Sequence, residues 1–485
     1  MLTIFMAVRT YIRTSGTSVG SNITGVVIQP SWLLWRPGTA VPPMLVLSLF
    51  PSLTVPSRIK PIFDRPHPGD SGTPSDGDHP ICPDGGFSFI LCRMRNFIAE
   101  RAASVQESVI REMTRLADRH NAINLSQGLP DFNPPEFLVQ AAVSAVKEGF
   151  NQYSYTWGRK GLREAVARFY ERRAGISFDP ETEVVITCGA SEAIVASILA
   201  VVEPEDEVIV IEPFYENYVP AVRMAGGRPV FVSLEPDEDR WILDIEKLRS
   251  AFSPRTKALI LNTPHNPTGK CFSPEELSAI AELLSEHNAV LITDETYEFI
   301  TYEKEHVLPI SIDGLLERTI TVSTFSKTFA ATGWRVGYAL AREELLSGVR
   351  RMHDYLTICA PTPFQRAFEQ VLDSIAHAYF KSVADAYRAK RDVIVDGLKK
   401  LGFRVVPPEG AYYVLADFSE IFDGDDWEFA RFMVRDGGVA GVPGSSFYHD
   451  PRHGAHQIRF SFAPSLDTIV EAIERMEKRI KTRRT

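Results

Sequence analysis

Residues 257–294 read KALILNTPHNPTGKCFSPEELSAIAELLSEHNAVLITD. The two apolar runs near the ends of this stretch, Lys257–Leu261 and Ala289–Thr293, have the length and composition of buried strands. Between them, Ser273 is a suitable N-cap and Pro274 a suitable first residue for a helix that runs to about His287. A strand, a helix and a second strand in this order predict a parallel β-α-β unit.

The same alternation continues on both sides of this unit. Further short apolar runs are found at Glu183–Thr187, Glu207–Ile211, Pro229–Val232 and Thr319–Ser323. Strands of a parallel sheet have this continuous apolar character because helices cover both faces of the sheet. The pattern therefore predicts an α/β fold, with a mostly parallel sheet in a large domain flanked by helices.

The C-terminal part of the chain has a different pattern. After about residue 380 the predicted helices are longer, and the predicted strands are Phe403–Val406, Ala411–Ala416 and Ile458–Phe462. We interpret this part as a smaller α+β domain, on which an amphipathic helix predicted over roughly residues 98–119 could pack. The predicted division is 94–139 and 381–485 for the small domain and 140–380 for the large domain.

Residues 1–93 differ from the rest of the chain. They contain 12 of the 33 prolines, and no acidic residue precedes Asp64. Because proline works against regular structure, we expect a poorly ordered extension. Translation from a start codon upstream of a natural start at Met94 would add such a segment. A transit peptide is the alternative, since Arg9 and Arg13 lie among many Ser and Thr residues. We expect this segment to contribute nothing to the functional site.

Composition and charge argue against several classes of protein. Apolar residues make up 44% and charged residues 24%, as in globular proteins, and no apolar stretch reaches the ~18–20 residues of a membrane span. The net charge of −10 disfavours a general nucleic-acid binder, which would be basic. The five cysteines show no CxxC pair and no metal-ligand spacing, so we expect free thiols, no bound metal and a cytoplasmic location.

Several unusual motifs stand where the predicted parallel strands end, and such strand ends are where these sheets bind ligands. The motifs of dinucleotide-binding folds, phosphate loops, zinc proteases and α/β-hydrolases are absent. The strand ends carry instead Gly189-Ala190-Ser191, Asn262–Lys270, Asp294–Tyr297 and Ser323–Thr328, with Arg335 following.

Each of these motifs alone has an ordinary alternative. Asn-Pro-Thr-Gly is common turn chemistry, Asp294 could cap a helix, and a lone lysine is most often a solvated surface residue. Their shared position at strand ends is what favours a functional site.

Seven blocks of the chain form a recognisable set: Asn124–Phe132, Asn151–Gly158, Glu212–Tyr215, Asn262–Lys270, Asp294–Glu298, Ser326–Gly337 and Ile458–Phe460. With them the chain resembles the fold-type-I pyridoxal-phosphate aminotransferases of class I and II, over about residues 94–480. Within that family the blocks are most similar to kynurenine/glutamine-type, methionine and aspartate aminotransferases. The resemblance implies pyridoxal 5'-phosphate as cofactor, amino-acid and 2-oxo-acid substrates, and a homodimer.

The resemblance also implies roles around the cofactor ring. Lys327 would bind the cofactor aldehyde and later act as the base, two tasks that a primary amine of lowered pKa can perform. Asp294 would pair with the ring nitrogen, while Asn266 and Tyr297 would hydrogen-bond the ring hydroxyl. Tyr215 would stack on the ring. Lys327, Asp294 and Tyr297 are thereby the predicted catalytic residues.

Further implied roles concern the two charged ends of the ligands. The cofactor phosphate would be bound by Ala190, Ser191, Thr324, Ser326 and Arg335. Tyr153 would reach the phosphate of the neighbouring subunit. Arg459 would bind the substrate α-carboxylate as a bidentate pair. Asn266 and Gly128 would also bind the substrate, and Gly128 lies in a loop that closes over it. Thr324 departs from the serine of many relatives but keeps the hydroxyl.

These assignments describe an aminotransferase that moves an amino group from an L-amino acid to a 2-oxo acid by a ping-pong route. A carbon–sulfur β-lyase with the same cofactor is the alternative, because it would share every residue above. A regulator with a relict aminotransferase domain is less favoured, because residues 1–93 do not resemble a basic DNA-binding domain. For the substrate side chain no second arginine can be placed, and the aromatic candidates are His265, Tyr155, Trp157 and Tyr218.

Overall fold

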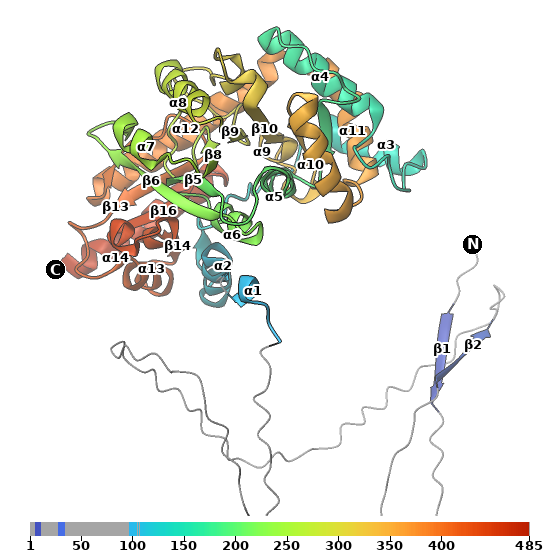
Figure 1. Ribbon diagram of the computed structural model, residues 1–485. Coiled ribbons are helices and arrows are strands. Elements are labelled where there is room, and N and C mark those ends of the chain that lie inside the picture. The colour runs from blue at the N-terminus through green and yellow to red at the C-terminus, as the bar shows by residue number, and fades with distance from the viewer. Residues whose placement is uncertain (1–4, 11–27, 34–96, 104, 106, 485) are drawn as a thin grey trace, which may run out of the picture. The chain divides into compact units, whose positions relative to one another are not determined.

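The computed structural model of the chain describes residues 5–10, 28–33, 97–103, 105 and 107–484 (Figure 1). The chain forms two units, Met1–Ile90 and Leu91–Thr485. In the first unit, strand β1 (Phe5–Thr10) pairs antiparallel with β2 (Ile28–Leu33). The remainder of the extension predicted over residues 1–93 lies outside the described residues, so its poor order stays a prediction.

An eight-stranded sheet dominates the second unit, with the strand order β4-β11-β10-β9-β8-β5-β6-β7. Its strands are β4 (Val184–Thr187), β5 (Glu207–Glu212), β6 (Arg228–Pro236), β7 (Trp241–Leu243), β8 (Thr256–Asn262), β9 (Val290–Asp294), β10 (Thr319–Thr324) and β11 (Gly337–Leu340). Strand β11 runs antiparallel to both its neighbours, and β7 runs antiparallel to β6. The other six strands share one direction, which confirms the mostly parallel α/β sheet.

Helices cover both faces of this sheet, as the alternation along β5 shows. Val208 and Val210 pack into a core with α5 (Ala190–Val201), α6 (Tyr218–Met224) and α10 (Glu343–Leu356). Ile209 and Ile211 point to the opposite core, which contains α7 (Ile245–Ala251) and α8 (Pro274–Glu286). Ser273 and Glu276 form a capping box at the start of α8, where the sequence predicts the helix to begin. These two layers are separated by the sheet in Figure 1.

A third core lies at the β4 end of the sheet. It is formed by α3 (Glu136–Lys147), α4 (Lys160–Ala174) and α11 (Thr362–Val371), together with residues of β4 and β11. Short helical turns follow several elements: α9 (Phe325–Thr328) and the 3₁₀ turns Pro309–Ser311, Leu316–Arg318, Thr332–Trp334, Leu372–Ser374, Gly444–Phe447 and Pro451–Gly454.

The C-terminal part builds a smaller α+β layer. Its sheet has the order β12-β13-β16-β15, and β3 pairs in parallel with β14. The elements are β3 (Ile123–Asn124), α12 (His377–Leu401), β12 (Arg404–Val405), β13 (Tyr413–Asp417), α13 (Asp426–Arg435), β14 (Val439–Ala440), β15 (Val442–Pro443), β16 (Gln457–Ser461) and α14 (Leu466–Arg484).

This layer has its own core, to which the chain segment before residue 126 contributes. Met113 and Ala117 pack there with Ile394 and Leu398 of α12. Phe380, near the start of α12, belongs instead to the core at the β4 end of the large sheet. The predicted boundary 380/381 thus falls inside a helix that contributes to both cores.

The helix predicted over residues 98–119 is corrected by the structure. Two helices, α1 (Glu100–Ala103) and α2 (Val109–His120), stand in its place. Ser108 accepts a hydrogen bond from the backbone N–H of Arg111 at 3.3 Å and thereby caps α2. A capping residue starts a new helix, which the apolar spacing alone does not reveal.

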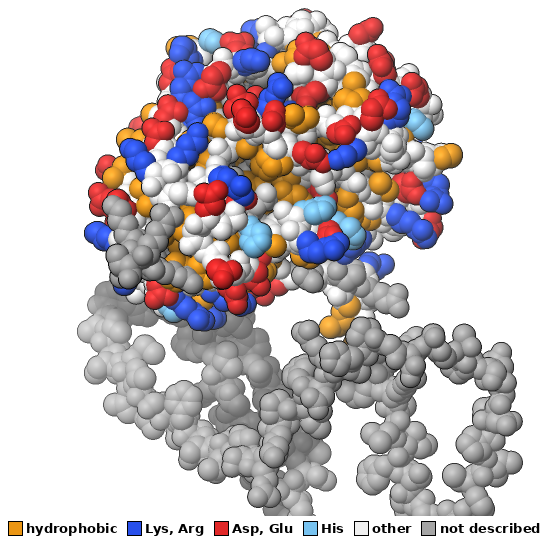
Figure 2. Space-filling view, turned by 90° about the vertical axis from the view of Figure 1, so that its left-hand side faces the viewer, with side chains coloured by type: hydrophobic (Ala, Val, Ile, Leu, Met, Phe, Trp, Pro, Cys, Tyr) orange, Lys and Arg blue, Asp and Glu red, His pale blue; other side chains and the backbone are white. Residues whose placement is uncertain are grey.

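The surface of this unit is polar and mixed in charge. On the face shown in Figure 2, acidic and basic side chains are interspersed around a strip of apolar ones, so neither sign dominates it. Within the described part of the chain, no helix has both the length and the apolar character needed to cross a membrane.

Candidate active site

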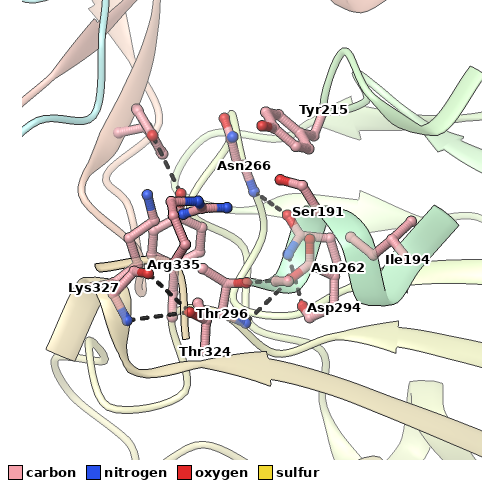
Figure 3. A pocket seen from close by; sticks show the side chains of 14 residues that line it. Ser191, Ile194, Tyr215, Asn262, Asn266, Asp294, Thr296, Thr324, Lys327 and Arg335 are labelled. Carbon is pink, nitrogen blue, oxygen red and sulfur yellow. Dashed lines mark hydrogen bonds between the residues drawn. The ribbon is translucent and has the colours of Figure 1, made fainter. Parts of the chain in front are cut away.

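A pocket opens where the parallel strands β8, β9 and β10 end and helix α5 begins (Figure 3). It is lined by Ala190, Ser191, Ile194, Tyr215, Asn262, Asn266, Asp294, Thr296, Tyr297, Thr324, Ser326, Lys327, Arg335 and Tyr413. Ten of the residues that the sequence assigns to a site meet here. The four that the sequence analysis does not assign are Ile194, Asn262, Thr296 and Tyr413. The motifs at separate strand ends therefore form one site.

One end of the pocket is built to receive an anion. Helix α5 begins at Ala190 without a side-chain cap, so its first backbone N–H groups are open to a ligand. Gly189, at φ 78°, lies directly under the guanidinium of Arg335, because a Cβ atom there would come within 2.3 Å of Nη2. Gly337 permits the same approach, since its Cβ would lie 2.8 Å from the Ala190 nitrogen. The Arg335 guanidinium and the first N–H groups of α5 are thus close together at this end of the pocket.

Hydroxyl groups surround the same end. Thr324 Oγ1 donates to the Val336 carbonyl at 2.8 Å and lies 2.9 Å from Ser326 Oγ. The backbone N–H of Ser326 donates to Thr324 Oγ1 at 3.2 Å, which fixes the turn after β10. The hydroxyl of Ser191 lines the pocket from α5. Hydroxyls, open N–H groups and a guanidinium are the donors that bind a phosphate dianion.

Asp294 is the carboxylate that lines the pocket. It is buried, Tyr218 donates to its Oδ2 at 2.7 Å, and Thr296 Oγ1 donates to its Oδ1 at 2.5 Å. Burial raises the pKa of Asp294 above its usual value, while the hydrogen bonds from Thr296 and Tyr218 oppose that rise. Both carboxylate oxygens are therefore held in place, and a cation in the pocket would complete the pairing.

Lys327 lies half-buried in the same pocket without a carboxylate in salt-bridge contact among the described residues. The pKa of its amine is lowered to about 8, mainly by loss of hydration and also by the nearby charge of Arg335, while the charge of Asp294 opposes the shift. An amine of this pKa is partly neutral near physiological pH and can act as a nucleophile or a base.

Arg459 lies behind the pocket, fully buried. Its Nη1 donates to Asn266 Oδ1 at 3.0 Å and its Nη2 donates to the Ser126 carbonyl at 2.5 Å. The guanidinium lies over the rings of Tyr413 and Phe447, at 4.4 and 4.9 Å from their centroids. No carboxylate of the described chain pairs with it, and its buried Nε has no partner there. A buried unpaired cation of this kind favours an anionic ligand.

Other predicted residues lie away from the pocket. Tyr153 is 79% exposed and does not line it, and Gly128 is packed against Tyr413 without lining it. Of the aromatic candidates His265, Tyr155, Trp157 and Tyr218, none lines the pocket. The phenol of Tyr218 acts instead on Asp294, a contact that no local pattern in the sequence indicates. Among the described residues there is no cluster able to hold a metal ion.

A buried histidine, His353, connects helix α5, which begins at the anion-binding end of the pocket, to the segment that carries Tyr153. His353 Nδ1 lies 3.1 Å from both carboxylate oxygens of Glu192, and Nε2 lies 2.8 Å from the Thr156 carbonyl. Since carbonyl and carboxylate oxygens only accept, these contacts favour the protonated imidazole, in which both ring nitrogens donate. Burial would lower the pKa of His353, but the hydrogen bond and charge of Glu192 raise it above its usual value.

This pairing predicts a pH-dependent stability. A histidine with a raised folded-state pKa stabilises fully below its unfolded pKa of about 6.5, and that contribution is lost as pH rises through the folded value. The free energy of unfolding should therefore fall by on the order of 1 kcal/mol more in the wild type than in His353→Gln between pH 6 and pH 9. Urea unfolding of both proteins at several pH values measures this difference. Parallel pH profiles of the two would contradict it.

Known proteins are similar to this chain in sequence and in fold. The model of the family described as aminotransferase class I and II matches residues 120–476. The probable N-succinyldiaminopimelate aminotransferase DapC of Mycobacterium tuberculosis is 43% identical over 379 residues, covering 76% of this chain and 95% of that protein. Human kynurenine–oxoglutarate transaminase 1 is 37% identical over 398 residues, covering 76% and 94%. The solved structure of the N-succinyldiaminopimelate aminotransferase from M. tuberculosis superposes with a TM-score of 0.76 at 42% identity, over 79% of this chain and 99% of that one.

Proposed function

This chain belongs to the class I and II aminotransferases and transfers an amino group from an L-amino acid to a 2-oxo acid with pyridoxal phosphate, and we propose that the pocket around Lys327 is its active site. The observation that carries the proposal is the juxtaposition in one pocket of the Lys327 amine, whose pKa is lowered, the Asp294 carboxylate and the Arg335 guanidinium. These are the groups that an aldehyde, a ring nitrogen and a phosphate require.

The residues present fit the cofactor phosphate. We assign it to the N–H groups of Ala190 and Ser191, the hydroxyls of Thr324 and Ser326, and Arg335. The absence of a Cβ at Gly189 and Gly337 supports this, because side chains there would displace the guanidinium or the helix start. The Arg335 Nη atoms also donate to the carbonyls of Thr332 and Cys188, at 3.0 and 3.3 Å. These hydrogen bonds orient the guanidinium toward the proposed phosphate site.

The residues around the ring position fit as well. Asp294, oriented by Tyr218 and Thr296, would hold a proton on the ring nitrogen. The Oδ1 atom of Asn266 accepts from Arg459, so its amide Nδ2 is the group left to donate to the ring hydroxyl. Tyr297, whose OH donates to the Tyr413 OH at 3.2 Å, would be the second partner of that hydroxyl. Tyr215 would lie against the ring face.

Pyridoxal phosphate supplies an aldehyde that takes up the substrate amine and a ring that withdraws electrons from the substrate Cα. The chain supplies the proton transfers and the orientation. Lys327 removes the proton from the substrate Cα and returns it in the reverse half-reaction, a task for which its pKa of about 8 is well placed. Asp294 would balance the positive charge of a protonated ring nitrogen.

Arg459 is proposed to bind the α-carboxylate of the substrate. Its burial and its lack of a carboxylate partner in the described chain support this role, because a bound carboxylate would compensate the buried charge. The carboxylate would orient the substrate Cα toward Lys327. A bidentate contact of this kind distinguishes arginine from lysine, so Arg459→Lys should raise the KM of the amino donor.

The identity of the amino donor is the next part of the proposal. Relatives are named for N-succinyldiaminopimelate, kynurenine and methionine. We propose that one of these classes is the donor. A panel of N-succinyl-diaminopimelate, kynurenine and methionine, each assayed with 2-oxoglutarate and with pyruvate, and of glutamate assayed with pyruvate alone, tests it by kcat/KM. A failure of all donors with both acceptors would contradict the proposed function.

We also propose a homodimer whose two sites share residues. Tyr153 and Tyr355 are 79% and 93% exposed, and their segments are joined, since Gln365 Nε2 donates to Ser154 Oγ at 3.0 Å and His353 contacts Thr156. Large exposed aromatic side chains on one surface are typical of an interface. A cytoplasmic location is proposed with it, supported by the free thiols of the described cysteines, Cys188, Cys271 and Cys359.

Subunit mixing tests the shared site. Tyr153→Ala alone should weaken cofactor binding about tenfold or more, because a hydrogen bond to a charged phosphate is lost. Mixed with the inactive Lys327→Ala protein, it should regain activity, since one site of each heterodimer would hold Lys327 from one subunit and Tyr153 from the other. Activity of the mixture no higher than that of Tyr153→Ala alone would show that Tyr153 does not cross the interface.

A further inference from the structure

The segment from Ser126 to Phe132 forms a wall next to the proposed carboxylate site. The Ser126 carbonyl accepts from Arg459, and the Gly128 carbonyl accepts from the Tyr412 OH at 3.2 Å. A Cβ atom at Gly128 would lie 2.0 Å from the OH of Tyr413, which lines the pocket. The backbone of this segment is therefore in direct contact with the residues that define the substrate side of the site.

The far end of the segment is tied to a distant helix by Asp131. The Ser465 backbone N–H donates to Asp131 Oδ1 at 2.6 Å, and the hydroxyls of Ser465 and Thr468 donate to Oδ2 at 3.0 and 2.8 Å. Burial would raise the pKa of Asp131, but these hydrogen bonds lower it, so the carboxylate is ionised. Ser465 directly precedes α14 and caps it, since its Oγ accepts from the Thr468 N–H at 3.3 Å, so Asp131 holds the capping residue of this helix in place.

A second contact holds the neighbouring residue. The Lys390 ammonium of α12 lies 4.6 Å from the ring centroid of Phe132 and 4.8 Å from that of Tyr387, and it donates to the Ala463 carbonyl at 3.2 Å. Phe132 is 45% exposed, and this cation–π contact ties it to α12. The segment is thus attached to α12 and to the start of α14, but its other end lies at Arg459.

We propose that Asp131 is a positioning residue of the reaction: by binding Ser465 and Thr468 at the start of α14 it holds the Ser126–Gly128 backbone against Tyr413 and Arg459. The inference rests on the proposed role of Arg459 in binding the substrate carboxylate. Without these hydrogen bonds, the far end of the segment would keep only the cation–π contact of Phe132, and the backbone would hold its distance from the guanidinium less firmly. The Asp131 carboxylate thereby acts on substrate affinity without contacting substrate or cofactor.

The test compares Asp131→Asn with Asp467→Asn in the cofactor-loaded enzyme. Asp467 lies exposed in the first turn of α14, so its substitution removes the same charge near the same helix end without touching the segment. We expect Asp131→Asn to raise the KM of the amino donor about tenfold, with kcat and the cofactor absorbance changed little, because charge-assisted hydrogen bonds are weakened while Lys327 and Asp294 are intact. Asp467→Asn should leave KM unchanged, and Asp131→Glu should restore part of the affinity.

Hydrogen exchange provides an independent readout. The backbone amides of residues 126–132 should exchange faster in Asp131→Asn than in the wild type and in Asp467→Asn. A lower thermal midpoint with unchanged KM and unchanged exchange would show a purely structural cap and overturn the proposal. If Arg459→Lys leaves the KM of the donor unchanged, the proposed carboxylate site fails instead, so the two failures are distinguishable.

Discussion

Replacement of Lys327 by alanine is expected to abolish transamination. Lys327 is the only lysine of the described residues that lines the pocket, and the pKa of its amine is lowered to about 8. A general base contributes about 10²–10⁴-fold to a rate, and the loss of the covalent attachment of the cofactor adds to this. The visible absorbance of the bound cofactor should disappear with the activity, and both are measured on the purified protein.

An exposed lysine provides the matched control for this prediction. Lys304 lies on the surface after β9 and does not line the pocket, so Lys304→Ala should keep the absorbance and the activity. A Lys327→Ala protein that still holds its cofactor through a borohydride-reducible link would show that another amine forms the attachment.

Asp294→Asn is expected to keep some cofactor and to lose about 10²–10⁴-fold in turnover. The amide has nearly the shape of the carboxylate. Its single oxygen can still accept from one of the two hydroxyls, Tyr218 or Thr296, and the other hydroxyl can turn to accept from the amide NH2, so the pocket should remain intact. It cannot, however, balance a protonated ring nitrogen, and the electron-withdrawing capacity of the ring falls with that proton. Turnover under saturating cofactor and donor measures the loss, and the thermal midpoint checks the fold.

Glu295, the residue after Asp294, is the nearest alternative carboxylate in the sequence, but its own contacts engage it away from the pocket. Glu295 is fully buried, but its carboxylate accepts from Thr293 Oγ1 at 2.7 Å and lies 2.7 Å from His306 Nε2, and it does not line the pocket. Near-normal turnover of Asp294→Asn would mean that another carboxylate holds the ring, and would contradict the assignment.

The strand pattern in the sequence predicts the main sheet because its central strands are long apolar runs flanked by helices. Strands β5, β8, β9 and β10 lie within one or two residues of the predicted ranges. Strand β11 is missed because Gly337–Leu340 is only four residues long and follows the Arg335 turn without a boundary signal. Strand β7, with three residues, is missed for the same reason.

The site is predictable where a residue stands at the end of its own strand, as Asp294 and Lys327 do. Tyr413 could not be found in this way, because it comes from β13 and reaches the pocket only through packing of the C-terminal layer beside Gly128. The hydrogen bond from Tyr218 to Asp294 depends on how α6 lies against the sheet, and that is a tertiary contact without a local signal.

The most direct test of the central claim is to map the covalent attachment of the cofactor. The holoenzyme is reduced with borohydride, digested, and analysed by mass spectrometry for the lysine that carries the phosphopyridoxyl group. Our account predicts the label on Lys327 alone, with none on Lys270, the buried lysine whose ammonium is bound by the Trp241 carbonyl and Glu276. A label on any other lysine, or no label on a protein that transaminates, would contradict it.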